Sequence, residues 1–261
     1  MSTLPTLSYG EYQLVYNMLS FAIASMVGSF AFFVLARSQV SARFRPALVM
    51  SSLVVGIAAY HYFRIFNSWD AAFVLKDGVY SPSGHPFNDA YRYVDWLLTV
   101  PLLCAELVSV LALAKAVRGP LMTRMVIASV LMIATGYPGE VATDITARAI
   151  WGAVSTVPFL YLMYALWIEL SKAIPSQPPR VQALFKNTRL LLFATWGFYP
   201  IAYLMPQLGI AGSTAEVSLQ VGYSLADVAA KCGYGLMIYA IARAKMEAAG
   251  ETAGSLAEQP A

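Results

Sequence analysis

The sequence predicts an all-α membrane protein: a bundle of seven transmembrane helices with an extracellular N-terminus and a cytoplasmic C-terminus. Of the 261 residues, 59% are hydrophobic and only 12% are charged, whereas soluble domains carry about 25% charged residues. The apolar residues gather in runs close to the roughly 20 residues that a helix needs to cross a bilayer. Because a helix satisfies its own backbone groups in lipid, and no run alternates like a membrane β-strand, each run is expected to be helical.

Seven apolar runs have the required length, at about residues 12–36, 46–66, 90–113, 121–139, 146–172, 187–207 and 216–243. Short connections join them, which predicts one domain over residues 1–246. Residues 247–261 are small and polar and are expected to form a disordered cytoplasmic tail. The longest connection, 67–89, has room for a short hairpin. The N-terminus lacks the basic region that begins a cleaved signal peptide.

The basic residues set the orientation, because Lys and Arg concentrate in cytoplasmic connections. The opposite connections offer only Lys76 and Arg148, among several carboxylates. Twelve basic residues share the side that we therefore assign to the cytoplasm: Arg37, Arg43, Arg45, Lys115, Arg118, Arg124, Lys172, Arg180, Lys186, Arg189, Arg243 and Lys245.

One face of the predicted helix 90–113 carries its polar side chains. At about 100° per residue, five side chains fall within about 80° of one another: Arg92, Asp95, Thr99, Leu103 and Glu106. Asp95 and Glu106 are separated by roughly 16 Å along the axis, too far for direct proton transfer. A single buried carboxylate can be a hydrogen-bonded packing residue. Several on one face more often mark a pathway or a counter-ion.

Lys231 supplies the group between the two carboxylates. It lies near the centre of the run 216–243, and Asp227 lies one turn before it on the same face. A desolvated lysine amine is a good nucleophile toward a carbonyl, so the pair fits a Schiff base with an aldehyde. The alternative is a structural Lys–Asp ion pair. The two cysteines, Cys104 and Cys232, both fall inside spans, and neither a disulfide nor a metal site is expected.

Aromatic and small residues on the neighbouring helices could surround such an aldehyde. Aromatic stripes at helical spacing usually form plain core, but beside a central lysine they can form a slot for a long, flat, apolar ligand. The candidate lining residues are Trp96, Met132, Gly136, Ser155, Thr156, Phe159, Trp196, Tyr199, Pro200 and Tyr203.

Three stretches together resemble the microbial rhodopsins. They are "RYVDWLLTVPLL" (92–103), "WGFYP" (196–200) and "ADVAAK" (226–231). The resemblance covers all seven spans. It implies a protein of a prokaryotic inner membrane that binds all-trans-retinal as a Schiff base on Lys231. It also implies a light-driven ion translocator rather than an enzyme, with a homo-oligomeric assembly (pentamer or trimer) and no nucleic-acid partner.

The resemblance assigns roles to the polar residues. Asp95 matches the primary counter-ion and proton acceptor, Glu106 the cytoplasmic proton donor, and Asp227 the second counter-ion. Arg92 matches an arginine on the extracellular side of the Schiff base, and Thr99 a threonine one turn from the acceptor. The Asp95–Thr99–Glu106 triplet resembles that of outward proton pumps such as proteorhodopsin.

Two further matches refine the resemblance. His61 in "AAYHYFRIF" matches a histidine that bonds the acceptor aspartate and is expected to couple to its titration. Leu103 matches the position at which proteorhodopsins with Leu absorb green light and those with Gln absorb blue light. At the extracellular exit only Glu216 is found in the segment 206–220, where bacteriorhodopsin has a pair of glutamates.

The stretches "HYFRIFNSWDAAFVL", "MIATGYPGE" and "DVAAKCGYG" are most similar to xanthorhodopsin and its cyanobacterial relatives. Like xanthorhodopsin, this chain has a glycine, Gly152, where many relatives have a large aromatic residue. The resemblance implies a window beside the retinal ring in which a carotenoid antenna, a xanthophyll, can lie. The alternative is a helix-packing glycine, which is common in membrane bundles.

The sequence therefore predicts a light-driven outward proton pump. The runner-up is a photosensory rhodopsin that signals to a transducer. A third reading, from another class, is a seven-helix receptor or carrier without a chromophore, in which Lys231 and Asp227 form a structural pair.

Overall fold

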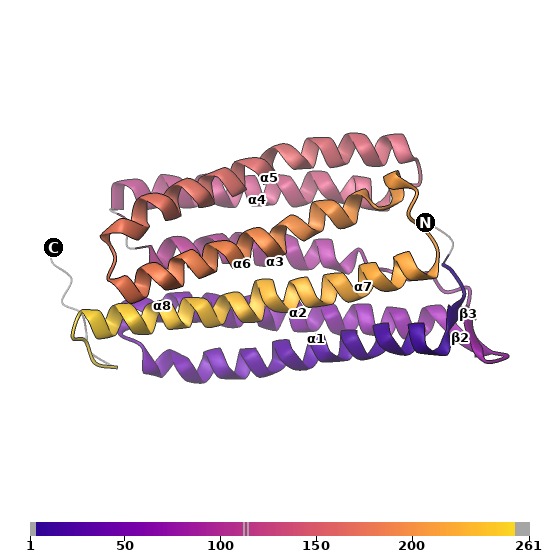
Figure 1. The fold of residues 1–261 in the computed structure, drawn as a ribbon, viewed down its shortest axis with the longest axis horizontal. Helices are drawn as coiled ribbons and strands as arrows, with labels where there is room; N and C mark the ends of the chain where they lie inside the picture. The colour runs from indigo at the N-terminus through magenta and orange to yellow at the C-terminus, as the bar shows by residue number, and fades with distance from the viewer. Residues whose placement is uncertain (1–3, 112, 114, 254–261) are drawn as a thin grey trace.

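The computed structural model describes residues 4–111, 113 and 115–253, and within them seven long helices run side by side (Figure 1). The first six are α1 (Tyr9–Ala36), α2 (Arg45–Ala72), α3 (Tyr91–Val110), α4 (Lys115–Val141), α5 (Ile145–Ala173) and α6 (Pro179–Leu204). The seventh is continuous but has three parts: α7 (Ser213–Asp227), a π-helical segment (Val228–Gly233) and α8 (Tyr234–Ala248). The predicted seven-helix bundle is confirmed.

Six of the seven helices are long and apolar enough to cross a membrane, as judged on the described residues. The exception is α6. Its first half carries Arg180, Lys186 and Arg189, and its second half contains the "WGFYP" stretch, whose Gly, Tyr and Pro residues lower the mean hydropathy. Tyr199 and Pro200, two of the predicted lining residues, therefore also lower the mean hydropathy by which a membrane-spanning helix is recognised.

Several helix ends differ from the predicted ones. Helix α2 continues to Ala72, six residues beyond the expected end, and α6 begins at Pro179, eight residues before the expected start. Pro179 suits a first helical turn, because proline lacks only an N–H that would have no helical partner there. These helices project beyond the apolar run into the polar region, where hydropathy no longer marks them.

The C-terminal boundary also differs slightly from the prediction. Helix α8 ends at Ala248, two residues past the expected end of the domain. Beyond it, Glu251 forms an ion pair with Arg43 at 2.8 Å. The remainder of the predicted tail, 254–261, lies outside the described residues.

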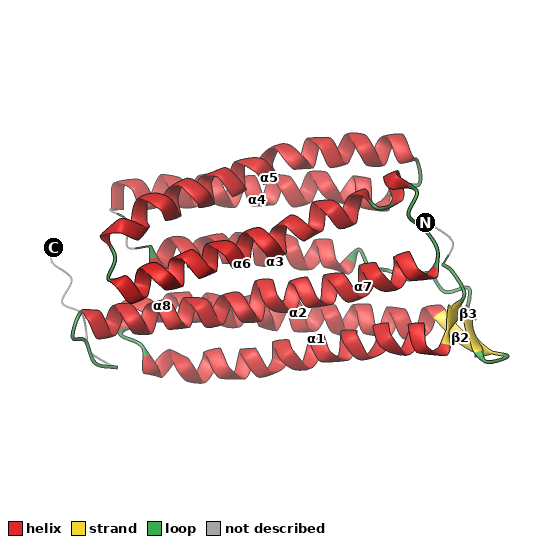
Figure 2. Ribbon diagram, viewed as in Figure 1, coloured by secondary structure: helices red, strands yellow, loops and turns green. Residues whose placement is uncertain are grey.

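A small antiparallel sheet lies at one end of the bundle (Figure 2). The hairpin allowed for in the connection 67–89 consists of β2 (Phe73–Lys76) and β3 (Val79–Pro82). Its turn is Asp77–Gly78, both with positive φ (51° and 82°), as a two-residue hairpin turn requires. A third strand, β1 (Leu7–Ser8), pairs with β3 and was not predicted, because two residues carry no periodic signal.

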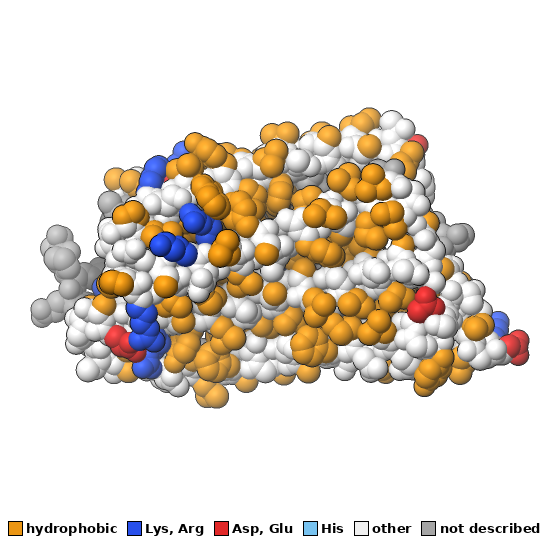
Figure 3. All heavy atoms as spheres, in the orientation of Figure 1, with side chains coloured by type: hydrophobic (Ala, Val, Ile, Leu, Met, Phe, Trp, Pro, Cys, Tyr) orange, Lys and Arg blue, Asp and Glu red, His pale blue; other side chains and the backbone are white. Residues whose placement is uncertain are grey.

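The two ends of the bundle differ in charge. We call the end with the sheet the hairpin end, and the opposite end, where α1, α3 and α8 finish, the basic end. Figure 3 shows Lys and Arg side chains gathered at the basic end and hydrophobic side chains along the length between the ends. This distribution matches a bundle whose middle faces lipid and whose basic end faces the cytoplasm.

Candidate functional site

Lys231 lies in the π-helical segment of the seventh helix and is only 3% exposed. Single π-turns inside α-helices are rare and are frequent at functional sites. The Lys231 Nζ lies 2.7 Å from Asp227 Oδ1 and 3.2 Å from Asp95 Oδ2. The structure therefore brings together one buried cation and two buried carboxylates from α3 and α7.

Asp227 is held by more than the lysine. The hydroxyl of Tyr62 on α2 donates to its Oδ2 at 2.8 Å, and the hydroxyl of Tyr199 on α6 donates to its Oδ1 at 2.6 Å. Tyr199 was expected only as a lining residue, and Tyr62 was not singled out at all. The sequence marks its neighbour His61 as a candidate site residue, because a histidine is unusual in an apolar run and a tyrosine is not.

Asp95 has a different environment, because no hydroxyl donates to its carboxylate in the described part of the chain. His61 Nδ1 lies 3.9 Å from Asp95 Oδ1, but the same nitrogen is 3.0 Å from the Ile57 carbonyl. The histidine is thus beside Asp95 without a direct hydrogen bond to it. The Thr99 hydroxyl donates to the backbone carbonyl of Asp95 at 2.9 Å rather than to the carboxylate.

Arg92 lies on the hairpin-end side of this cluster and is 2% exposed. Its Nη2 donates to Gln220 Oε1 at 2.7 Å, and its guanidinium lies 4.8 Å from the centre of the Tyr223 ring. Gln220 in turn donates to Glu216 at 2.9 Å. A polar chain therefore leads from the buried cluster toward the hairpin end, and Gln220 is a member that the sequence did not reveal.

Glu106 lies on the opposite side of the cluster, toward the basic end, and is fully buried. The hydroxyl of Ser51 on α2 donates a hydrogen bond to its Oε1. The nearby side chains of α3, Leu103, Leu107 and Val110, are buried core residues. Glu106 is thus an isolated carboxyl group in apolar surroundings with one hydroxyl partner.

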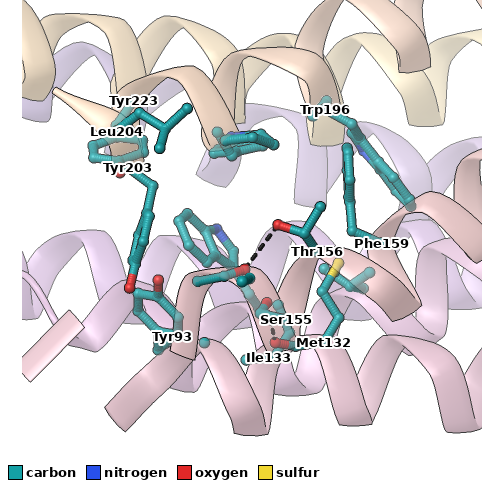
Figure 4. Close-up of a pocket in the computed structure, with 18 of the residues that line it drawn as sticks. Tyr93, Met132, Ile133, Ser155, Thr156, Phe159, Trp196, Tyr203, Leu204 and Tyr223 are labelled. Carbon is teal, nitrogen blue, oxygen red and sulfur yellow. Dashed lines mark hydrogen bonds between the residues drawn. The ribbon is translucent and has the colours of Figure 1, made fainter. Parts of the chain in front are cut away.

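A cavity of about 320 Å³ opens beside Lys231, within the size range of ligand pockets. Every predicted lining residue borders it, together with Leu103 and Gly152. Figure 4 shows Trp196 and Phe159 at one end of it and Tyr203, Tyr93 and Tyr223 at the other. The sequence missed eight further lining residues: Tyr93, Val100, Ile133, Ala149, Ala153, Leu204, Tyr223 and Ala230.

Gly152 lies where this cavity meets the outer surface between α5 and α6. Ala153 and Thr156 line the same cavity and are exposed, so the cavity reaches the lipid-facing side. The ring of Tyr203 packs against the glycine, since a Cβ on Gly152 would come within 2.5 Å of Tyr203 Cε1. The Tyr203 hydroxyl donates to the Arg148 carbonyl at 2.7 Å, which anchors the ring in this position.

These features define a class: a seven-helix membrane bundle with a buried lysine between two carboxylates, facing an aromatic cavity. The chain belongs to the bacteriorhodopsin-like protein family, which it matches over residues 13–245. It is therefore a microbial rhodopsin, and members of this family are light-driven transporters rather than chemical catalysts.

Known relatives agree with this assignment. The chain is 33% identical over 222 residues to the green-light absorbing proteorhodopsin of a gamma-proteobacterium, covering 84% of this chain and 82% of the relative. Its fold is similar to that of thermophilic rhodopsin, with a TM-score of 0.91, 55% identity, and coverage of 95% of this chain and 99% of the other. It is equally similar to xanthorhodopsin, a light-driven ion pump with dual chromophore, with a TM-score of 0.91, 53% identity, and coverage of 95% and 100%.

Proposed function

We propose that this protein is a light-driven outward proton pump that carries all-trans-retinal on Lys231. The observation that carries the proposal is the position of Lys231 Nζ, 3.2 Å from Asp95, with a second buried carboxyl group, Glu106, on the same face of α3 toward the basic end. Buried ionisable groups in a membrane bundle mark ion pathways. Here they lie on both sides of a single buried amine.

The residues around Lys231 fit retinal. The cavity is lined mainly by aromatic and small apolar side chains, and the lysine amine forms part of its wall. Retinal bound to Lys231 would supply a light-driven change in the position and proton affinity of the nitrogen. In this structure the amine nitrogen of Lys231 occupies the place of the Schiff-base nitrogen that the lysine would form with retinal. A lysine serving only as a structural partner of Asp227 would need no cavity beside it.

The different hydrogen bonding of the two aspartates supports different roles for them. Tyr62, Tyr199 and Lys231 already donate to Asp227, so its lone pairs are largely used. Asp95 has lone pairs available, since no hydroxyl of the described residues donates to its carboxylate. A proton leaving Lys231 Nζ therefore passes to Asp95, while Asp227 remains an anchored counter-ion.

Protons then move in one direction because the two exits differ. Toward the hairpin end, Arg92 lies about one helical turn before Asp95 on α3, and hydrogen bonds join Arg92 to Gln220 and Gln220 to Glu216. Toward the basic end, Glu106 is the carboxyl group placed to return a proton to Lys231 Nζ, and Ser51 fixes its orientation. With the basic end in the cytoplasm of a prokaryotic inner membrane, the net movement is outward.

The opening at Gly152 supports a carotenoid antenna as an additional part of the proposal. The cavity reaches the lipid-facing surface there, as a xanthophyll ring would require. The ring of Tyr203 partly fills the opening, so the glycine also serves helix packing. An assembly of several copies, a pentamer or a trimer, is proposed from the family resemblance alone.

Light-driven acidification of a cell suspension tests the pump directly. Cells that produce the protein with retinal should acidify the medium on green illumination, and a protonophore should abolish the signal. A Lys231→Ala variant is the matched control and should have neither a visible absorption band nor a light response. Alkalinisation, or no change despite a visible band, would contradict outward pumping and favour a photosensor.

A further inference from the structure

Lys245 is a buried basic residue that the proposed proton path does not use. It lies near the end of α8 and is only 8% exposed, whereas Arg243, two residues before it, is partly exposed and pairs with Glu247. No carboxylate of the described residues lies within ion-pair distance of Lys245. An ammonium buried in this way is costly unless its environment provides a specific partner.

The partner of Lys245 is the end of α3. Its Nζ donates to the carbonyl oxygen of Val110 at 2.7 Å and lies 5.4 Å from the centre of the Phe185 ring on α6. Val110 is the last residue of α3, so its carbonyl has no partner within the helix. A cation at a helix C-terminus is also favoured by the helix dipole. One side chain thus joins the ends of α3, α6 and α8.

This junction lies over Glu106. Val110 follows Glu106 by one helical turn on the same face of α3, roughly 6 Å further toward the basic end. The core at this end of the bundle contains buried apolar side chains: Leu107, Val110, Phe185 and Ile241 belong to one cluster and are all 1% exposed or less. A proton that enters along α3 from the basic end must therefore pass the point at which Lys245 holds the three helices together.

We propose that Lys245 is a latch on proton uptake: its bond to the Val110 carbonyl keeps the basic end closed over Glu106, and release of that bond admits the proton that refills Glu106. Lys245 is a positioning residue, because it acts through the ends of the helices and touches neither Lys231 nor Glu106 in the proton path. The inference rests on the proposed pump function and adds a control point to it.

The test compares Lys245→Met with the parent protein, both with retinal and in nanodiscs. Methionine keeps an apolar stem beside Phe185 but cannot donate to Val110. Loss of one charge-assisted hydrogen bond should shift a local opening about tenfold. Flash-induced proton uptake, followed with a pH-indicating dye, should become about tenfold faster. Amide hydrogen exchange should accelerate in the α3 peptide that contains Val110 and remain unchanged in the half of α3 near Asp95.

Arg43→Met is the matched control, since it removes a nearby positive charge whose ion pair is with Glu251 and not with the end of α3. Arg43 is paired with Glu251, so this variant should show uptake within about twofold of the parent. Equal acceleration in both variants would show that charge, and not the latch, sets the rate. Slower uptake in Lys245→Met would mean that the amine conducts protons. Faster amide hydrogen exchange in α3 with unchanged proton uptake would show that Lys245 only caps the helix and does not control uptake.

Three further outcomes separate failure of the latch from failure of the pump. If Lys245→Met does not bind retinal, Phe185→Leu replaces it as the test variant. This substitution weakens the same junction from α6 and should also accelerate proton uptake. Unchanged uptake in that variant would then overturn the latch. If the parent protein binds retinal but takes up no proton in the light, both the proposed pump function and the proposed latch are wrong. Normal parental uptake that Lys245→Met leaves unchanged overturns the latch alone.

Discussion

Asp95 and Lys231 face each other across the centre of the bundle, with Lys231 Nζ 3.2 Å from Asp95 Oδ2. Asp227 lies nearer to the same nitrogen, at 2.7 Å, but two tyrosine hydroxyls also hold it. The shorter contact is therefore the more fixed one, and the longer contact is the one with capacity to receive a proton. In the proposed pump, this asymmetry directs the proton of Lys231 Nζ to Asp95 rather than to Asp227.

The first prediction concerns the acceptor. Asp95→Asn should shift the absorption band to longer wavelength and reduce light-driven acidification to the background of cells without the protein. A neutral amide neither stabilises a positive charge at Lys231 Nζ nor accepts its proton. Absorption spectra and the acidification assay measure the two effects on the same sample. Retained outward pumping in Asp95→Asn would mean that another group takes the proton.

A second prediction concerns the donor. Glu106→Gln should leave the loss of the proton from Lys231 Nζ intact but slow its return by about a hundredfold, a typical contribution of general acid catalysis. The slowing should grow as the pH rises, since protons must then come directly from the medium. Flash photolysis at several pH values measures the return. An unchanged rate would make Glu106 a packing residue.

Ser51 offers a milder change at the same place. Ser51→Ala removes the hydroxyl that donates to Glu106 Oε1 while leaving the carboxyl group present. Loss of one net hydrogen bond, worth about 1 kcal/mol, should change the return rate by about fivefold. Ser52→Ala is a suitable control, because the Ser52 hydroxyl bonds within its own helix, to the Leu48 carbonyl. Equal effects in both variants would exclude a specific role for Ser51.

The fold could be predicted from the sequence because lipid imposes one strong rule: each run that crosses it is apolar and helical. The rule stops at the membrane boundary. The end of α2 predicted from hydropathy is therefore too early, and the predicted start of α6 is too late. The strand Leu7–Ser8 is too short to show a periodic pattern in the sequence. Only the length of the connection 67–89 indicated room for a hairpin; its turn, Asp77–Gly78, has the positive φ values of a two-residue hairpin turn.

The central cluster of the site could also be predicted, because charged residues are rare in membrane helices and stand out singly. Lys231, Asp95, Asp227 and Glu106 all belong to this group. The residues that orient them do not stand out. Tyr62 and Ser51 are ordinary in an apolar helix, and only the three-dimensional packing of α2 against α3 and α7 gives them partners.

A further prediction concerns colour. Leu103 borders the cavity beside Lys231 and is 3% exposed. Leu103→Gln should place an amide dipole next to the chromophore and shift the absorption band to shorter wavelength, by the analogy with green- and blue-absorbing proteorhodopsins given above. Leu103→Met, which adds no amide, is the control and should shift it less. An unshifted band in Leu103→Gln would show that this side chain does not face the chromophore.

The last prediction concerns the opening at Gly152, where the ring of Tyr203 already lies in the space that a Cβ would occupy. If the opening admits a carotenoid, a xanthophyll added to the purified protein should bind between α5 and α6. Blue light that it absorbs should then drive pumping. Gly152→Trp fills the opening with a rigid side chain and should block this gain. Green-light pumping should persist, because Lys231, Asp95 and Glu106 lie elsewhere.

Action spectra of pumping, with and without xanthophyll, decide between an antenna and a packing glycine. Any side chain at Gly152 must displace Tyr203, so a second variant is needed that blocks the opening from another position. Thr156 lies one turn further along α5, is exposed and lines the same opening, and Thr156→Trp provides this second block. Tyr203→Phe keeps the ring but removes its bond to the Arg148 carbonyl, and should leave the blue-light gain at least at the parental level. Without a blue-light gain in the parent, or with equal gains in the parent and both Trp variants, Gly152 would serve only to seat Tyr203.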